Sequence, residues 1–302
     1  MDGKINNLAQ IASVRRYVFT DGREKGINVI DCDNGKIRFL LNESKALDIM
    51  QVYHEGQNVS FLSKNAFTKR EIPFINRFEG GMLYTCGLDI AGSVKGLEPH
   101  GTLHNTPAEI VYANIDGDEI RVEANVRVSA LFGQNLILNR KITCKLGADN
   151  FTIDDTVINA GFSEAQYCIL YHINVGYPML DKDAKIKLDY TNIEACSNWA
   201  KENENTAQLI TDSVPCQEEM CYYYNLVKPE ISLINEKIQK TLTVTYSQDT
   251  LPCFLQWKSM ASGDYALGLE PCTSKIGESI EHKKLKANEE VKFKVNVKIT
   301  KN

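Results

Sequence analysis

Period-two alternation of apolar and polar residues runs through most of this chain and restricts it to a β architecture. The alternating runs are rich in Val, Ile, Thr and aromatic residues and span residues 37–42, 109–129, 136–159, 240–247, 252–260, 265–271 and 289–299. Asp116-Gly117 interrupts the second run, and Gly147 the third, with residues that tolerate positive φ and therefore predict hairpin turns. The sequence predicts an all-β fold of large antiparallel sheets.

Helical signals are few and short. The best are SKALDIMQVYH at 44–54 and a polar stretch, SNWAKENENTAQLI, at 197–210. No linker, internal repeat or low-complexity segment divides the chain. We therefore expect a single domain over residues 1–302, in which two large sheets pack face to face and a concave face carries a ligand.

Charge and composition exclude several classes of partner. The net charge is −5 and no long Lys/Arg run is present, which argues against nucleic acid and anionic membranes as partners. No signal-peptide core or membrane-spanning apolar run is visible, so we expect a cytoplasmic protein. The nine cysteines form no Cys-x-x-Cys pair, which favours free, buried thiols over zinc ligands or disulfides.

The strand-like stretch QYCILYHINVGYP, residues 166–178, carries a histidine in an apolar setting. His172, Asn174 and Gly176 share one face of such a strand, while the residues between them form an apolar face. One interpretation is that the polar face meets a small polar ligand. The other is that His172 is a hydrogen-bonded core residue, which is the commoner situation for a lone histidine.

The segment at 76–110 is a long loop punctuated by glycines. It brings Arg77, Asp89, His100, His104 and Asn105 into a region where the chain must turn sharply. Such loops are usually functional, although solvated surface histidines would give the same composition. It contains no phosphate-binding glycine pattern. His100 and His104 also lack the helix and the glutamate of a zinc protease, so we expect no metal.

The stretch at 254–274 places a carboxylate at the end of an apolar strand. Burial of Glu270, just before Pro271, would raise its pKa toward the range of a general base, although a strand-end carboxylate can also simply meet solvent. Trp257 offers a flat apolar surface on which a sugar can stack, or it belongs to the core.

Motifs along nearly the whole chain resemble the aldose 1-epimerase-like proteins, in particular a bacterial branch catalogued as a domain of unknown function. The motifs that carry the resemblance are GGMLYTCGLD (80–89), HGTLHNTPAE (100–109), YHINVGYP (171–178) and FLQWKSMASGDYALGLEP (254–271). The resemblance implies a galactose-mutarotase-like β-supersandwich with few short helices. It also implies interconversion of the α and β anomers of a free aldose without metal or organic cofactor.

The same resemblance implies roles for individual residues. Glu270 matches the general base that takes the proton of the anomeric hydroxyl, and His172 matches the acid that protonates the ring oxygen. His100 and Arg77 match residues that hold sugar hydroxyls. The chain has Thr102 and Lys45 where the branch usually has arginine. Further sugar contacts are therefore expected from Asp48, Asn105, Asn174, Gln256, Trp257 and Lys258.

The leading hypothesis is a mutarotase, an isomerase acting on a free monosaccharide. A non-catalytic sugar-binding or sugar-sensing module with the same fold is the main alternative, since the two missing arginines could remove turnover while leaving affinity. Lyase or hydrolase chemistry on a sugar is a third interpretation, but no residue obviously assists a leaving group. A homodimer is left open by the sequence.

Overall fold

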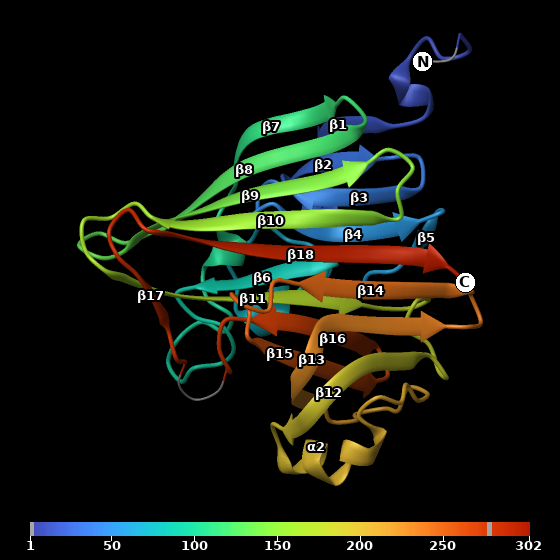
Figure 1. Ribbon diagram of the computed structural model, residues 1–302, viewed down its shortest axis with the longest axis vertical. Helices are drawn as coiled ribbons and strands as arrows, with labels where there is room; N and C mark the ends of the chain where they lie inside the picture. Colours follow the sequence, from blue (N-terminus) through green and yellow to red (C-terminus); the bar gives the residue numbers. More distant parts are fainter. Residues whose placement is uncertain (1–2, 277–279) are drawn as a thin grey trace.

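Two antiparallel sheets form the framework of the computed structural model, which describes residues 3–276 and 280–302 (Figure 1). The smaller sheet has five strands in chain order: β1 (Ser13–Val18), β2 (Asn28–Asp33), β3 (Ile37–Asn42), β4 (Asp48–His54) and β5 (Gln57–Asn58). The larger sheet has 13 strands, and its main path runs β17-β11-β16-β15-β13-β14-β18-β10-β9-β8-β7. In addition, β6 pairs with β11, and β12 pairs with β13.

The strands of the larger sheet are long, and the helices are short. The strands are β6 (Leu83–Leu88), β7 (Glu109–Asp116), β8 (Glu119–Ser129), β9 (Asn135–Lys145), β10 (Asn150–Asn159), β11 (Ala165–Val175), β12 (Lys185–Ala195), β13 (Met220–Asn235), β14 (Lys240–Tyr246), β15 (Cys253–Ala261), β16 (Asp264–Cys272), β17 (Lys283–Leu285) and β18 (Glu290–Lys301). The helices are η1 (Leu8–Gln10), η2 (Gly22–Glu24), α1 (Phe74–Arg77), η3 (Leu103–Asn105), α2 (Asn198–Glu202) and η4 (Glu204–Thr206).

The alternating sequence pattern becomes an alternating pattern of burial. In β8, β9 and β10 almost every second side chain is buried, and a hairpin turn at Gly117, with φ 62°, joins β7 to β8. The prediction of an all-β fold with few short helices is confirmed.

The core lies between the two sheets. The smaller sheet packs behind the part of the larger sheet made by β8–β10 and β18 (Figure 1). Phe39 of β3 stacks on Phe151 of β10 with ring centroids 5.7 Å apart. Burial of the facing apolar side chains holds the layers together.

One of the two helix predictions is wrong. Residues 44–54 form a turn followed by strand β4. Ala46 and Leu47 have φ values of 49° and 56°, which a helix does not allow, and β4 hydrogen-bonds to β3. Pairing within the sheet therefore outweighs the local helix signal. The prediction at 197–210 is confirmed by α2 and η4.

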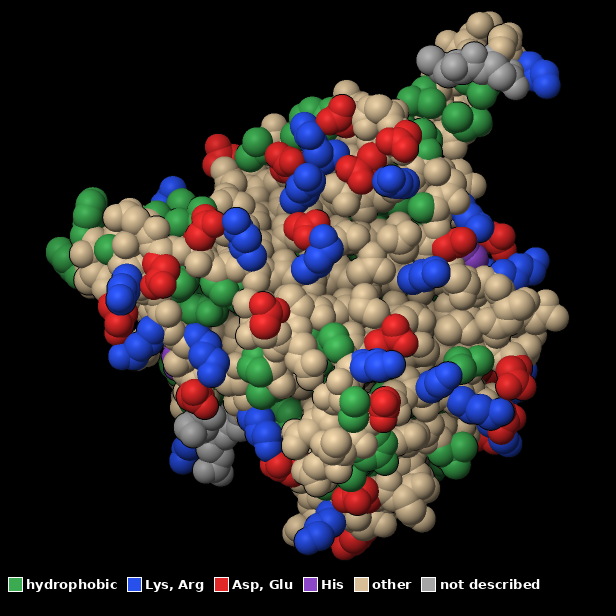
Figure 2. All heavy atoms as spheres, viewed as in Figure 1, with side chains coloured by type: hydrophobic (Ala, Val, Ile, Leu, Met, Phe, Trp, Pro, Cys, Tyr) green, Lys and Arg blue, Asp and Glu red, His purple; other side chains and the backbone are tan. Residues whose placement is uncertain are grey.

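All nine cysteines are free thiols, as expected, but Cys196 and Cys216 are exposed rather than buried. Within the described ranges, no helix combines the length and the apolar character that crossing a bilayer requires. Figure 2 shows acidic and basic side chains interspersed over the visible face.

A buried arginine joins the two sheets. The guanidinium of Arg140 on β9 lies 2.7 Å from Asp155 on β10 and 2.5 Å from Asp48 on β4. It also donates to the hydroxyl of Thr85 on β6 at 2.9 Å and to the carbonyl of Ala46 at 3.1 Å. The Arg140 side chain is fully buried, so its charge is balanced entirely by these neighbours.

We expect Arg140→Leu to lower the free energy of unfolding by about 3–5 kcal/mol, because the variant leaves two carboxylates buried without their cation. The measurement is denaturant unfolding at neutral pH. The matched control is Arg121→Leu, in the same sheet, whose partly exposed side chain pairs with Asp116 and Glu123; it should cost less than about 1 kcal/mol. Equal losses in the two variants would contradict the structural role assigned to Arg140.

Candidate active site

The register of two neighbouring strands places His172 opposite Glu270. β11 and β16 are antiparallel, and Leu170 pairs with Cys272 while Ile173 pairs with Leu269. The same register sets His172 against Glu270. The two buried side chains meet, with His172 Nε2 3.3 Å from Glu270 Oε1.

A cavity of about 630 Å³ lies over this pair. Of the residues expected in the site, four line it together: His100, His172, Trp257 and Glu270. Aromatic residues of the covering loops and of α1 complete much of the wall, namely Phe61, Phe74 and Phe78. The two sequence segments expected to contribute the acid and the base therefore meet at one concave site.

Aromatic rings surround the imidazole of His172. Its ring centroid lies 5.4 Å from that of Trp257, 5.5 Å from that of Phe78 and 5.7 Å from that of His100. Burial holds the pKa of His172 well below 6.5; His100 lowers the pKa further, and hydrogen bonding to Asn174 opposes the shift.

Burial acts on Glu270 in the opposite sense. It raises the pKa of this carboxyl well above 4.5, and the charge of Glu219 raises it further. The same burial therefore disfavours the charged form of both groups, which lie 3.3 Å apart. Within the described part of the chain, His172 Nδ1 and Glu270 Oε1 have no hydrogen-bond partner, so polar atoms remain free for a ligand.

His100 is fixed by its own loop. Its backbone has φ 64°, an uncommon conformation for a histidine, and the Gly92 N–H donates to His100 Nδ1 at 3.3 Å. Burial lowers the pKa of His100 to about 4, so the ring is neutral near pH 7. Because Nδ1 accepts, the proton lies on Nε2, which makes His100 a hydrogen-bond donor.

Sequence reasoning missed Gly268 and Glu219. A Cβ on Gly268 would lie 2.2 Å from Glu270 Oε1, so this glycine leaves the space that the carboxylate occupies. The sequence already contained a signal for this role, because Gly268 lies two residues before Glu270 and therefore on the same face of the strand. Glu219 lines the cavity and accepts a hydrogen bond from Trp257 Nε1 at 2.7 Å, which orients the indole.

The cavity does not include Arg77. Although it belongs to α1, whose neighbouring residues line the wall, its guanidinium lies 2.9 Å from Glu98 Oε1 and donates to the Ile72 carbonyl at 2.9 Å. These bonds fix α1 to the loop that carries Glu98. We therefore no longer assign a sugar contact to Arg77.

Asp48, Asn174 and Asn105 also lie outside the lining. Asp48 is buried behind the cavity, where its oxygens accept from Thr85 and contact His104 and Arg140. Asn174 is fully buried, and its amide donates to the His172 carbonyl at 3.0 Å, so it supports the main chain at His172. Asn105 ends η3, and its backbone N–H bonds to Thr102.

Gln256 and Lys258 point to the other face of β15. Leu255, Trp257 and Ser259 line the cavity, so alternation along the strand turns their neighbours away. Gln256 donates to the Ala207 carbonyl at 2.8 Å, and the Lys258 ammonium donates to the carbonyls of Thr206 and Leu209. They hold the segment that follows α2 against the sheet.

The two positions that depart from the family pattern have structural partners. Lys45 Nζ lies 3.0 Å from Glu79 Oε1, and both side chains are buried. Thr102 donates through its N–H and its hydroxyl to Asp89, in both cases at 3.0 Å. Neither residue lines the cavity.

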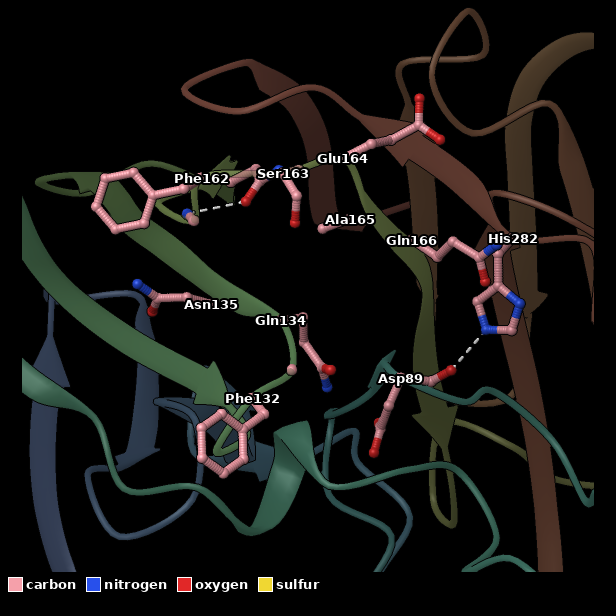
Figure 3. Close-up of a pocket in the computed structure, with 13 residues that line it drawn as sticks. Asp89, Phe132, Gln134, Asn135, Phe162, Ser163, Glu164, Ala165, Gln166 and His282 are labelled. Carbon is pink, nitrogen blue, oxygen red and sulfur yellow. Dashed lines mark hydrogen bonds between the residues drawn. The ribbon is translucent and has the colours of Figure 1, made fainter.

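A second cavity, of about 460 Å³, lies elsewhere on the larger sheet (Figure 3). Phe132 and Phe162 project from two loops at its rim and are fully exposed. His282 Nε2 donates a hydrogen bond to the Asp89 carbonyl at 2.7 Å. The described lining residues of this cavity include neither His172 nor Glu270. Among the described residues, no group of three or more His, Cys, Asp or Glu side chains is arranged to hold a metal ion.

Solved structures with the same fold come from several bacteria. A protein from Klebsiella pneumoniae provisionally described as an aldose 1-epimerase has a TM-score of 0.85 at 18% identity, covering 98% of this chain and 87% of its own. A galactose mutarotase-like protein from Clostridium acetobutylicum has a TM-score of 0.72 at 13% identity, covering 97% and 100%. Galactose 1-epimerase from Lactobacillus acidophilus has a TM-score of 0.67 at 12% identity, covering 96% and 99%. At these identities the likeness establishes the galactose-mutarotase-like fold.

No curated protein matches the chain. The family profile described as "Domain of unknown function (DUF4432)" matches residues 24–299, nearly the whole length. The protein therefore belongs to the DUF4432 family, and it has an aldose 1-epimerase-like fold.

Proposed function

We propose that the protein is a mutarotase that interconverts the α and β anomers of a free monosaccharide, with Glu270 and His172 as the acid–base pair. The observation that carries the proposal is the contact of 3.3 Å between these two buried groups at the base of a cavity. The two oxygens that exchange protons in mutarotation are attached to the same anomeric carbon. Their catalytic partners must therefore be close neighbours, as these two side chains are.

The reaction uses one proton held by the pair. Transfer of that proton from Glu270 to His172 gives a carboxylate beside an imidazolium. The carboxylate then takes the proton of the anomeric hydroxyl, while His172 donates its proton to the ring oxygen and the C1–O5 bond breaks. Rotation about C1–C2 and closure with the roles reversed give the other anomer. The scheme uses only side chains of this chain.

His100 and Trp257 complete the binding surface. The neutral His100 ring can donate a hydrogen bond from Nε2 to a sugar oxygen, and Trp257 offers an apolar face held by Glu219. One rival function is a sugar-binding module without turnover. It is favoured by the orientation of Arg77 away from the cavity, since no described lining residue supplies a guanidinium that could polarise the ring oxygen.

We expect Glu270→Gln to slow anomer exchange by about 10²–10⁴-fold, because the amide cannot take the hydroxyl proton. The rate is measured by magnetisation-transfer NMR on a panel of aldoses. The control is Glu230→Gln, which alters an exposed carboxylate on β13 and should keep the wild-type rate. If wild-type protein binds a sugar and accelerates none, the binding module replaces the mutarotase.

The pH dependence follows from the two opposite pKa shifts. The active pair carries one proton; His172 takes up a second one only below its usual value of 6.5, and Glu270 loses the last one only well above 4.5. We therefore expect kcat/KM to fall on the acid side, as His172 takes up the second proton, and to fall again on the alkaline side, as Glu270 loses the last one. A single ionisation near pH 4.5, as for a solvated glutamate, would contradict the pairing.

Gly268→Ala should lower kcat while sugar binding persists, because the new methyl group displaces the Glu270 carboxylate. We expect a loss of at least about tenfold, on the scale of a misplaced catalytic group. Gly161→Ala is the control. The new Cβ atom would lie 3.0 Å from the side-chain oxygen of Asn159, and the next nearest atoms, in Asn135, would be 3.9 Å away. An unchanged kcat with an unchanged pH profile would show that Gly268 does not position the base.

A further inference from the structure

The charges around the main cavity are unsuited to an anionic ligand. Among the described lining residues, Lys64 is the one Lys or Arg, and its ammonium lies 2.7 Å from Asp264, which also lines the cavity. Glu219 and Glu270 add two further carboxyl groups. A phosphate or carboxylate in this space would therefore lose water without gaining an unpaired cation.

Three basic residues from segments near the cavity have side chains that are bound to other partners outside it. Arg77 pairs with Glu98 at 2.9 Å, and Lys45 pairs with Glu79 at 3.0 Å. The Lys258 ammonium donates to two backbone carbonyls on the opposite face of the sheet. Recruiting any of them would first break a contact that the fold already uses.

Polar side chains in the loop part of the lining are engaged with their own loops. The Ser63 hydroxyl donates to the Phe78 carbonyl at 2.5 Å, and the Asn65 amide donates to the carbonyls of Ile75 and Phe78. Trp257 donates to Glu219. Ser93, Gln217 and Ser259 also line the cavity. The rings of Phe61, Trp257, Phe78 and Phe74 contact one another in series and form one continuous apolar wall, and Leu255 and Ile276 are further apolar residues of the lining.

We infer that the substrate is an uncharged deoxy sugar, whose CH₂ or CH₃ edge lies on this apolar wall while its hemiacetal faces His172 and Glu270. The inference rests on the proposed mutarotase function. A hydroxyl on the same edge would be buried against rings that offer it no partner. Apolar pockets reject an added hydroxyl only moderately, so the discrimination expected is about 10–100-fold.

The test compares matched sugars that differ by one oxygen. Anomer exchange is measured for L-fucose against L-galactose, for 2-deoxy-D-glucose against D-glucose and for 2-deoxy-D-ribose against D-ribose, with D-glucose 6-phosphate and D-glucuronate as anionic probes. In at least one pair the deoxy sugar should have a kcat/KM about 10–100-fold higher than its parent. The anionic sugars should show no acceleration. Equal or better turnover of every parent, or best turnover of an anionic sugar, overturns the inference.

A variant checks that the wall itself discriminates. Phe74→Tyr adds one hydroxyl to a half-buried ring of the lining and should reduce the preference for the deoxy member of the best pair. An unchanged preference would place the deoxy edge elsewhere and overturn this assignment of the wall.

Binding measurements separate this inference from the proposed function. The chain has two tryptophans, and Trp199→Phe leaves Trp257 in the cavity as the one fluorophore of this kind. Tighter quenching by deoxy sugars without any acceleration of exchange would support the ligand class and overturn the mutarotase. Acceleration of exchange without a preference for deoxy sugars would support the mutarotase and overturn the ligand class. If no sugar binds, both the mutarotase and the ligand class are overturned.

Discussion

The pairing of Arg140 with two carboxylates is the interaction on which the interior depends. It is the first part of a chain of buried, contacting acidic and basic side chains that runs from the larger sheet to the loops. Its members are Asp155, Arg140, Asp48, His104, Glu79 and Lys45. Glu79 precedes Phe78 in the chain, and the Tyr84 ring stacks on His104 with centroids 3.6 Å apart while it also contacts Phe78. The aromatic wall of the cavity therefore rests on a layer of paired charges, whose partners are each costly to remove.

The proposed acid–base pair depends on sheet register in a similar way. His172 and Glu270 lie far apart in sequence, and only the alignment of β11 with β16 brings them together. A shift of one residue in that alignment would turn one of them to the opposite face. The extensive pairing of both strands with their neighbours, and the space left at Gly268, hold the two groups in contact.

Much of the fold could be predicted from local pattern, because alternation and turn residues are local properties of the chain. The strand containing His172, the hairpin at Gly117 and the positions of His100 and Glu270 at the cavity agree with the sequence analysis. Strand β4 could not be predicted, since its pairing with β3 is a tertiary effect.

The errors in the site have a common physical cause: residue type was considered without the direction of the side chain. Gln256 and Lys258 flank Trp257 on one strand and so cannot share its face. Arg77 pairs with Glu98, and Asp48 pairs with Arg140 and His104. These partners come from other segments of the chain, and no local sequence pattern indicates the pairing. The strand period alone would have excluded the first two residues, whereas only the fold could exclude the others.

The two proposed acid–base residues lie on strands, whereas much of the remaining cavity wall comes from connecting segments. The proposed acid–base groups lie on adjacent strands of a hydrogen-bonded sheet, while Phe61, Phe78 and Glu219 come from segments between regular elements. Exchange of those connecting segments leaves the strand register intact, because loops tolerate substitution and insertion far better than sheet interiors do. The sheet can therefore stay unchanged while the connecting segments vary, and one framework of strands can acquire new ligands by changes in its loops.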